Sequence, residues 1–198
     1  EKTMCGIVAS LIHSISSQYS VDVVLEGLTR LEYRGYDSAG ICVEQNREAL
    51  LVKRVGEIKN LAEAIQGLKL QSKVAVGHTR WATHGGVTEA NAHPHLQGGL
   101  ALVHNGIIEN YQELKESLQK DGAQFKSQTD TEVFLHLVLQ KLENEPDLKK
   151  AFCQAYQEVR GHFCFVLLNI EKHEVYAIKR GAPLVCGKGS EHNLFVSS

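Results

Sequence analysis

The sequence has few of the features that mark membrane, nucleic-acid-binding or disulfide-rich proteins. No apolar stretch approaches the ~20 residues that a bilayer-spanning helix needs. Its 21 basic and 23 acidic residues give a net charge of -2, and the longest like-charged runs are short. The five cysteines form no Cys-x-x-Cys pair. We therefore expect a soluble, cytoplasmic protein with reduced thiols, no nucleic-acid partner and no membrane association.

The chain does have enough hydrophobic content for one core. It has 198 residues, of which 43% are hydrophobic, with 17 glycines and only 3 prolines. Met4 is the first methionine, so we expect residues 1–4 to be a remnant of cloning plus the initiator methionine. We expect residues 5–198 to form one domain that is truncated at its C-terminal end, because the last residues have the pattern of a strand.

Hydrophobic periodicity predicts a mixed α and β protein. Asn105-Gly106 is expected to form a turn directly after a strand, and Thr129-Asp130-Thr131-Glu132 matches a capping box at the start of a helix. The segment 77–99 is rich in histidine and glycine and has little periodicity, which is typical of a functional loop. The predicted strands cover 5–12, 39–44, 49–55, 74–76, 100–103, 162–170, 174–179 and 193–197, and the predicted helices cover 20–33, 58–67, 111–120, 129–142 and 147–159.

Cys5 is the first candidate for chemistry. Removal of Met4 would leave a thiol and a free α-amine on the same residue, and an α-amine with a pKa near ~7.7–8.0 can act as a base. A nucleophile activated in this way is suited to acyl transfer. Gly6 would then let a substrate approach closely. Met-Cys-Gly by itself is equally compatible with a small apolar residue on an edge strand.

Three further positions fit an amino-acid substrate. The Asn105 amide and the Gly106 N–H could stabilise a developing oxyanion, although Asn-Gly is also a common turn. Arg80 could bind a carboxylate and Asp130 an ammonium group. The ordinary alternatives are a surface ion pair for Arg80 and a first-turn helix charge for Asp130.

Histidines raise the possibility of a metal site. His78, His84, His93, His95 and His104 could gather a zinc ion, but their spacing fits no zinc pattern. We expect no metal and no cofactor, and we expect these histidines to hydrogen-bond loop backbone. In the polar turn Tyr33-Arg34-Gly35-Tyr36-Asp37-Ser38, Gly35 is able to take a left-handed conformation, and the simplest interpretation is that the turn ends the preceding helix.

Taken together, six ordered motifs resemble the glutaminase domain of the glutamine–fructose-6-phosphate aminotransferase family. The Cys-Gly start and the Asn-Gly pair are shared by class II glutamine amidotransferases in general. The segments Tyr-Arg-Gly-Tyr-Asp-Ser and Thr-Arg-Trp-Ala-Thr-His-Gly are typical of this family. The motifs are Met4-Cys5-Gly6-Ile7, Tyr33-Arg34-Gly35-Tyr36-Asp37-Ser38, His78-Thr79-Arg80-Trp81-Ala82-Thr83-His84-Gly85, Asn91-Ala92-His93-Pro94-His95, His104-Asn105-Gly106-Ile107-Ile108-Glu109-Asn110 and Thr129-Asp130-Thr131-Glu132.

The resemblance implies an α+β fold, the N-terminal-nucleophile hydrolase αββα sandwich of four layers with two antiparallel sheets. It also implies roles for individual residues. Cys5 would be the nucleophile, with Asn105 and the Gly106 N–H as the oxyanion hole. Around the substrate, Arg80 would hold the glutamine carboxylate, Asp130 would hold the ammonium group, Thr83 and His84 would line the pocket, Trp81 would guard the exit of ammonia, and Arg34 would support the site.

The implied activity is hydrolysis of L-glutamine to glutamate and ammonia through a cysteine thioester. In the family, C-terminal sugar-isomerase domains use the ammonia to convert fructose 6-phosphate to glucosamine 6-phosphate, and we expect the full-length chain to be a homodimer. Those domains are absent from this sequence. While residues 1–4 remain attached, Cys5 carries a peptide nitrogen that is not basic, so we expect no normal activity. The alternatives are another class II glutamine amidotransferase and a catalytically inactive module of the same fold.

Overall fold

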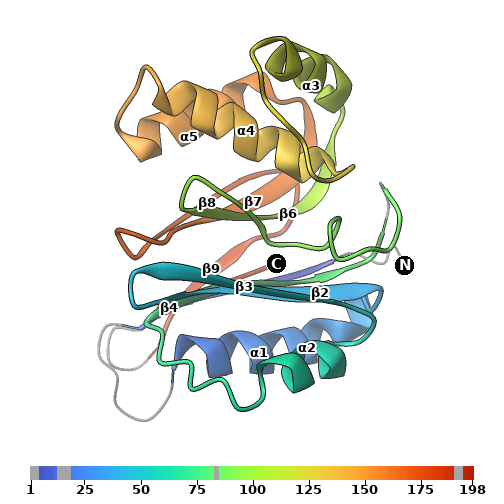
Figure 1. The fold of residues 1–198 in the computed structure, drawn as a ribbon, viewed down its shortest axis with the longest axis vertical. Coiled ribbons are helices and arrows are strands. Elements are labelled where there is room, and N and C mark those ends of the chain that lie inside the picture. Colours follow the sequence, from blue (N-terminus) through green and yellow to red (C-terminus); the bar gives the residue numbers. More distant parts are fainter. Residues whose placement is uncertain (1–4, 13–18, 83–84, 190–193) are drawn as a thin grey trace.

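The computed structural model describes residues 5–12, 19–82, 85–189 and 194–198, which form four layers (Figure 1). Two β-sheets face each other in the middle of the molecule. Helices α1 and α2 cover the outer face of one sheet, and α3, α4 and α5 cover the outer face of the other. This is the αββα sandwich that the motifs imply.

The first sheet has six strands in the order β3-β2-β4-β1-β10-β9, and all of its pairings are antiparallel. β1, at whose start Cys5 lies, runs between β4 and β10. The elements of this half are β1 (Gly6–Leu11), α1 (Ser20–Leu31), the short 3-10 helix η1 (Glu32–Arg34), β2 (Ser38–Gln45), β3 (Glu48–Val55), α2 (Ile58–Ile65), β4 (Val74–Arg80), β9 (Val185–Lys188) and β10 (Leu194–Ser197).

The second sheet has four antiparallel strands in the order β5-β6-β7-β8. Its longest strands, β6 and β7, lie at the centre and carry helices on their outer face. The elements of this half are β5 (His95–Gln97), β6 (Leu100–Ile108), α3 (Tyr111–Lys120), α4 (Asp130–Leu142), α5 (Leu148–Glu158), β7 (Gly161–Asn169) and β8 (Glu174–Arg180).

The alternation of side chains along each strand decides which layer they enter. On β4, Val74 and Val76 pack between the two sheets, whereas Ala75 packs toward α1 and α2. On β6, Ala101 and Val103 likewise lie between the sheets. The same alternation, continued along each strand, points His78, Arg80 and Asn105 into the space between the sheets.

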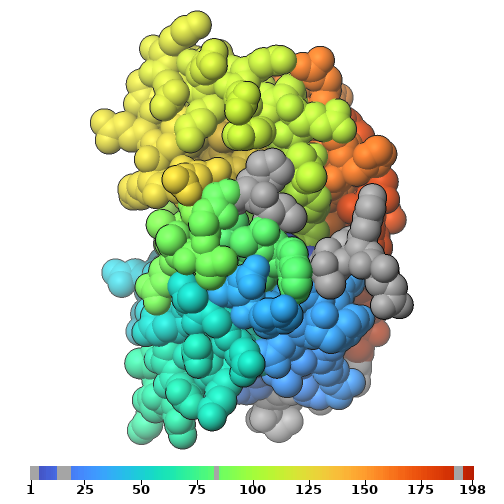
Figure 2. Space-filling model, turned by 90° about the vertical axis from the view of Figure 1, so that its right-hand side faces the viewer, coloured from blue at the N-terminus to red at the C-terminus, as the bar shows by residue number. Residues whose placement is uncertain are grey.

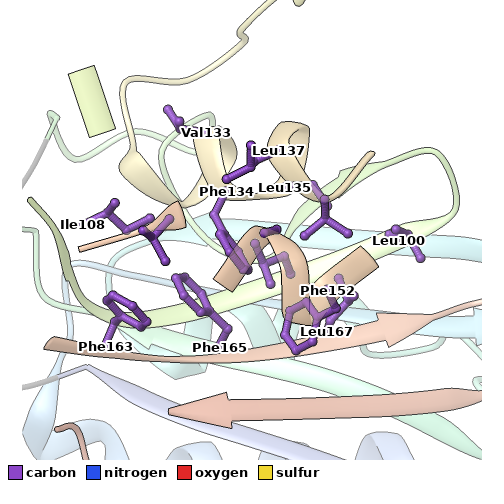
Figure 3. Close-up of a cluster of buried hydrophobic side chains, with 14 of the residues drawn as sticks. Leu100, Ile108, Val133, Phe134, Leu135, Leu137, Phe152, Phe163, Phe165 and Leu167 are labelled. Atoms are coloured by element: carbon purple, nitrogen blue, oxygen red, sulfur yellow. The ribbon is translucent and has the colours of Figure 1, made fainter. Parts of the chain in front are cut away.

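An aromatic cluster holds α4 and α5 against the second sheet (Figure 3). Phe134 of α4 stacks on Phe165 of β7 with ring centroids 3.9 Å apart and planes at 11°. Phe152 of α5 and Phe163 of β7 complete the cluster. We call these four residues the aromatic core. Each buried aromatic ring removes a large apolar area from water, which makes this contact a main source of stability.

Most predicted elements are present, and the differences lie mainly near the polar segments. β4 continues to Arg80, although 77–80 was predicted to be loop. Asn105-Gly106 lies inside β6 and is not a turn. The short strands β5 and β9 were not predicted. Strand pairing overrides the local polar sequence in each case, because the neighbouring strands supply the backbone hydrogen bonds.

The predicted capping box is half formed. The Thr129 hydroxyl accepts a hydrogen bond from the Glu132 N–H, 3.4 Å away, which caps α4. The Glu132 carboxylate does not return to Thr129 but accepts from the backbone N–H groups of Lys126 and Ser127 at 2.8 and 2.7 Å. Glu132 therefore orders the loop that leads into α4.

Among the helices that the structure describes, none is long and apolar enough to cross a bilayer.

Candidate active site

Cys5 opens onto a small pocket at one end of the space between the sheets. The pocket is built from both sheets, from the segment after β4 and from the first turn of α4. Figure 2 shows the green segment around 85–97 lying across this side of the molecule between the two halves. The residues that line the pocket are Cys5, Arg80, Trp81, His93, His104, Gly106, Thr129, Asp130 and Thr131.

The Cys5 thiol is held against the backbone of Trp81. The Trp81 N–H donates to Sγ at 3.1 Å, and the thiol lies 3.5 Å from the Trp81 carbonyl oxygen, to which it donates. Burial raises the pKa of the Cys5 thiol, while the Trp81 N–H and the charges of Arg80 and Arg34 oppose the rise. The thiol is thus protonated at neutral pH, and it needs a base before it can attack a substrate.

The two glycines near Cys5 serve packing. A Cβ on Gly6 would lie 2.7 Å from Thr79 Oγ1 and 2.8 Å from Leu31 Cβ, so this glycine makes room for its neighbours. Its role in substrate approach stays a prediction. Gly35 has a φ of -168°, which is extended and not left-handed. Its missing Cβ lets the chain cross the peptide between Arg80 and Trp81, whose backbone atoms would lie 2.8–3.0 Å away. Gly35 does end the short helix η1, but not in a left-handed conformation. At both positions the missing Cβ allows the close approach of neighbouring atoms.

Asn105 is buried directly beside Cys5. Its Nδ2 donates to the Cys5 carbonyl oxygen at 2.9 Å and to Ser198 Oγ at 3.1 Å, and its Oδ1 lies 3.0 Å from His78 Nε2. An oxyanion that binds Nδ2 would take the place of one of these two acceptors. The next residue, Gly106, has a φ of +119°, and a Cβ there would collide with the His162 carbonyl group on β7. Only glycine fits this backbone conformation beside β7, and Gly106 lines the pocket.

Arg80 and Asp130 bring opposite charges to the same pocket. Arg80 is only 3% exposed, and its Nη1 donates to the Gly86 carbonyl oxygen at 3.2 Å. Burial lowers the pKa of Arg80, and the nearby Cys5, Asp37 and Asp130 oppose that shift. Asp130 Oδ2 accepts from the Ile108 N–H at 2.9 Å. A surface ion pair does not describe Arg80, and Asp130 does more than face the helix dipole. A zwitterion would complement the two charges.

Of the other predicted site residues, two are described by the structure and two are not. Trp81 lines the pocket, and its indole packs edge-to-face on Tyr36 with ring centroids 5.2 Å apart. Arg34, at the end of η1, is half-buried, and its positive charge acts on the Cys5 thiol. Thr83 and His84 lie outside the described residues.

Buried histidines bind threonine hydroxyls at the start of α4, not loop backbone as expected. Thr131 Oγ1 lies 2.6 Å from His93 Nε2 and 2.9 Å from His104 Nδ1. Thr129 Oγ1 lies 2.8 Å from His95 Nε2. Burial lowers the pKa values of His93 and His95 well below their usual 6.5, so both are neutral at physiological pH.

His78 is the exception, because it does bind backbone. Its Nε2 lies 3.1 Å from the His104 carbonyl oxygen, and burial lowers its pKa to about 3. Within the described ranges, no group of three or more His, Cys, Asp or Glu side chains is placed to hold a metal ion.

Sequence reasoning missed the partners of Asn105. Ser198 accepts from Asn105 Nδ2, and His78 was considered only as a metal ligand or a loop residue. The signal for His78 was available in the sequence. It follows Val74 and Val76 with a period of two, which puts all three side chains on one face of a strand.

Comparison with known proteins gives long, continuous matches. The family model described as "Glutamine amidotransferase domain" matches residues 42–198. A glutamine–fructose-6-phosphate aminotransferase (isomerizing) from Acinetobacter baylyi is 44% identical over 196 residues, which cover 98% of this chain and 31% of the relative. The enzyme of that name from Thermus thermophilus is 46% identical over 196 residues, which cover 98% of this chain and 32% of the relative. The chain spans about a third of the length of these curated relatives.

Solved structures agree on the fold. The glutamine phosphoribosylpyrophosphate amidotransferase of B. subtilis, complexed with ADP and GMP, aligns with a TM-score of 0.84 at 26% identity, covering 98% of this chain and 41% of that one. A glutamine aminotransferase class-II domain protein from Silicibacter pomeroyi aligns with a TM-score of 0.66 at 16% identity, covering 98% of this chain and 88% of that one, which shows the fold alone. The predicted sandwich of two antiparallel sheets is confirmed. The chain belongs to the glutamine amidotransferase domain family.

Proposed function

We propose that this chain hydrolyses the side-chain amide of L-glutamine to glutamate and ammonia, with Cys5 as the nucleophile. One observation carries the proposal: a buried arginine and a buried aspartate, Arg80 and Asp130, line the same small pocket as the Cys5 thiol. An amino acid carries a carboxylate and an ammonium group on one carbon. The two side chains suit those two groups and would leave the substrate's side chain to reach Cys5.

In the first half of the reaction, Cys5 Sγ attacks the amide carbon of glutamine. The thiol proton passes to the α-amine of Cys5, directly or through water, and then to the leaving nitrogen, so that ammonia departs and a thioester remains. The negative charge that develops on the amide oxygen is stabilised by Asn105 Nδ2 and the Gly106 N–H. In the second half, water attacks the thioester, glutamate leaves, and the thiol regains its proton.

The raised pKa of the Cys5 thiol makes the α-amine necessary. A thiol that is protonated at neutral pH transfers its proton during attack, and the α-amine is the basic group on the same residue. We therefore propose that residues 1–4 are removed before the enzyme is active and that residues 5–198 are the catalytic domain. While Met4 remains attached, the nitrogen of Cys5 is a peptide nitrogen and cannot accept the proton.

For the whole protein, we propose the N-terminal glutaminase half of a cytoplasmic glutamine–fructose-6-phosphate aminotransferase (isomerizing). The identity of 44–46% over 98% of the chain supports this assignment. C-terminal sugar-isomerase domains would accept the ammonia and convert fructose 6-phosphate to glucosamine 6-phosphate. We propose that the full-length protein is a homodimer. Arg34, Trp81, Thr83 and His84 would line or support the glutamine pocket.

The test is an assay of glutamate and ammonia with the chain that begins at Cys5, whose start is verified by intact mass. We expect equal amounts of the two products from glutamine and much slower turnover of asparagine, whose shorter side chain would not reach Cys5 while its zwitterion is bound. An equal rate with both amides would contradict the binding roles of Arg80 and Asp130. Supplying fructose 6-phosphate or another acceptor to the full-length protein tests the assignment of the whole enzyme.

A further inference from the structure

Asn105 lies in a hydrogen-bond arrangement that fixes which end of its amide faces Cys5. An asparagine side chain can stabilise an oxyanion only through its NH2 end, and a half-turn of the amide would present the oxygen instead. The residues around Asn105 therefore matter as much as Asn105 itself. This inference rests on the proposed function, in which Asn105 stabilises the oxyanion.

His78 contacts the oxygen end of the amide from β4. It is completely buried, and its Nε2 lies 3.0 Å from Asn105 Oδ1 and 3.1 Å from the His104 carbonyl oxygen. A carbonyl oxygen only accepts hydrogen bonds, so Nε2 must carry the hydrogen. The same N–H then faces Asn105, and it requires an acceptor there. The His104 carbonyl thus determines the tautomer of His78, and the tautomer determines the orientation of the amide.

The other ring nitrogen of His78 is consistent with this tautomer. Among the described residues, Nδ1 is buried and has no hydrogen-bond partner. An unprotonated Nδ1 without a partner costs less free energy in this buried site than a protonated Nδ1 of a charged ring would cost. The pKa of His78 is lowered to about 3, chiefly by burial, and electrostatic interaction with His104 and Arg80 lowers it further; its hydrogen bonds to Asn105 and the His104 carbonyl oppose the shift. The ring is neutral across the physiological range.

Ser198 contacts the NH2 end of the amide from the opposite side. Its hydroxyl donates to the Pro183 carbonyl oxygen at 2.7 Å, so its oxygen is available to accept from Asn105 Nδ2 at 3.1 Å. The Cys164 thiol donates to the same oxygen at 3.3 Å. The second hydrogen of Nδ2 points to the Cys5 carbonyl oxygen at 2.9 Å. Every donor around the amide therefore meets an acceptor in only one orientation.

We propose that His78 is a positioning residue that, together with Ser198, locks the Asn105 amide with its NH2 end toward Cys5. In this role the His78 ring stays neutral and transfers no proton. It keeps the NH2 end in place before the substrate arrives, so that the amide need not turn over when the oxyanion takes the place of the Cys5 carbonyl oxygen as an acceptor. Without it, the amide could turn, and the fraction of molecules with the donor in place would fall.

Two substitutions and a control test the lock by activity, in the chain verified to begin at Cys5. His78→Phe keeps a flat ring but removes the donor, and we expect kcat for glutamine hydrolysis to fall about 10- to 100-fold with KM within about 3-fold. His78→Gln places an amide donor near the position of Nε2, and we expect kcat to recover to within about 3-fold of the unsubstituted chain. His136→Phe changes a buried histidine of α4 that is outside the pocket, and its kcat should stay unchanged.

The pattern of the variants separates positioning from other roles. If His78→Phe keeps full kcat, or if His78→Gln is as slow as His78→Phe, the lock is wrong. A proton-transfer role for His78 would remove one limb of the pH profile in His78→Gln, whereas positioning leaves the shape of the profile unchanged. Alkylation of Cys5 by iodoacetamide needs no oxyanion hole, so its rate should not change in His78→Phe. A slower rate would mean that the substitution damages the thiol site, and it would overturn the proposal.

A spectroscopic measurement tests the lock without glutamine turnover. The nitrogen NMR signals of the His78 ring should show a protonated Nε2 and a bare Nδ1 from about pH 5 to about pH 8. The two Asn105 amide hydrogens should give separate, slowly exchanging signals that broaden in His78→Phe and return in His78→Gln. A charged ring or the other tautomer would overturn the proposal. A chain that shows this pattern but does not hydrolyse glutamine would refute the proposed function and leave the lock standing.

Discussion

Two neighbouring regions of this molecule pack in opposite ways. The aromatic core of Phe134, Phe152, Phe163 and Phe165 joins α4 and α5 to the second sheet. The second region, which we call the polar layer, consists of His78, His93, His95, His104, Asn105 and Thr131 at one end of the sandwich. β6 contributes Leu102 to the apolar cluster that surrounds the aromatic core and Asn105 to the polar layer.

The two regions differ in how their buried atoms are satisfied. The aromatic core buries only apolar surface, and its rings stack or meet edge-to-face. The polar layer keeps several buried nitrogens without a partner among the described residues, including His93 Nδ1 and His104 Nε2. Such atoms cost stability, and apolar residues of the same volume would avoid the cost. We therefore propose that the polar layer is kept for the proposed chemistry of the pocket and not for the stability of the fold.

The largest effect is expected when the nucleophile is removed from the polar end of the molecule. Cys5→Ala should lower kcat for glutamine hydrolysis by at least about 10⁴-fold, because no other thiol lines the pocket described. The urea midpoint should move little, since the change leaves the aromatic core untouched. Glutamate formation within about tenfold of the parent would contradict the role of Cys5.

Next in size is the loss of a ring from the aromatic core. Phe134→Ala should lower the free energy of unfolding by about 3–5 kcal/mol, because the stacked partner Phe165 would face a cavity. Phe134→Leu is the matched control and should cost clearly less, since much of the volume is kept. Urea unfolding measures both. A cost below about 1 kcal/mol for the alanine variant would show that stability does not reside in this cluster.

A change of charge without a change of shape probes substrate binding. Asp130→Asn keeps an oxygen to accept from the Ile108 N–H but removes the negative charge. We expect KM for glutamine to rise about 30- to 300-fold, which corresponds to about 2–3 kcal/mol, with a smaller change in kcat. Steady-state kinetics at several glutamine concentrations separate the two constants. An unchanged KM would remove Asp130 from the binding of the ammonium group.

The polar layer should make the fold sensitive to acid. The pKa of His78 is about 3 in the folded chain and about 6.5 when unfolded, so between these values the unfolded chain binds the extra proton. Its contribution is therefore fully present above pH 6.5 and is lost as the pH falls toward 3. Between about pH 6.5 and about pH 5 we expect a loss of about 2 kcal/mol from His78. The pKa values of His93 and His95 are lowered too, which adds to the loss.

Unfolding in urea at a series of pH values measures this loss, and His78→Gln is the control, because it removes one titrating group and should make the slope shallower. A slope that is the same with and without His78 would mean that the ring is not held neutral.

The smallest effect on stability is expected when a surface ion pair outside both regions is removed. Arg30 and Glu26 form an exposed ion pair on α1 with a 2.6 Å contact and side chains 77% and 57% exposed. Arg30→Ala should change the free energy of unfolding by less than about 0.5 kcal/mol. A loss above about 1 kcal/mol in urea unfolding would show that exposed ion pairs stabilise this fold more than expected.

The sequence was sufficient for the apolar parts of the fold. Apolar or alternating runs located the strands beside the core, and the helix over 111–120 was predicted with its observed bounds. The Thr129 cap located the start of α4 because the hydroxyl and the Glu132 N–H are neighbours along the chain. These features depend on local contacts, so a single sequence can reveal them.

The polar segments were harder because their structure depends on distant partners. Asn105-Gly106 looks like a turn in isolation, but pairing with β7 keeps it in a strand. The need for glycine at positions 6 and 35 comes from Thr79, Leu31 and the Arg80 peptide, which no local pattern predicts. The roles of Cys5, Arg80, Asn105 and Asp130 were inferred from motifs, and the contacts of His78 and Ser198 became visible only in three dimensions.

The most direct test of the account is one comparison of rates. Glutamate formation from glutamine is measured with the chain as printed and with the chain trimmed to Cys5, both verified by intact mass. We predict activity only after trimming, because only then does Cys5 carry a basic amine beside its thiol. Equal rates before and after trimming would contradict the proposed role of the α-amine.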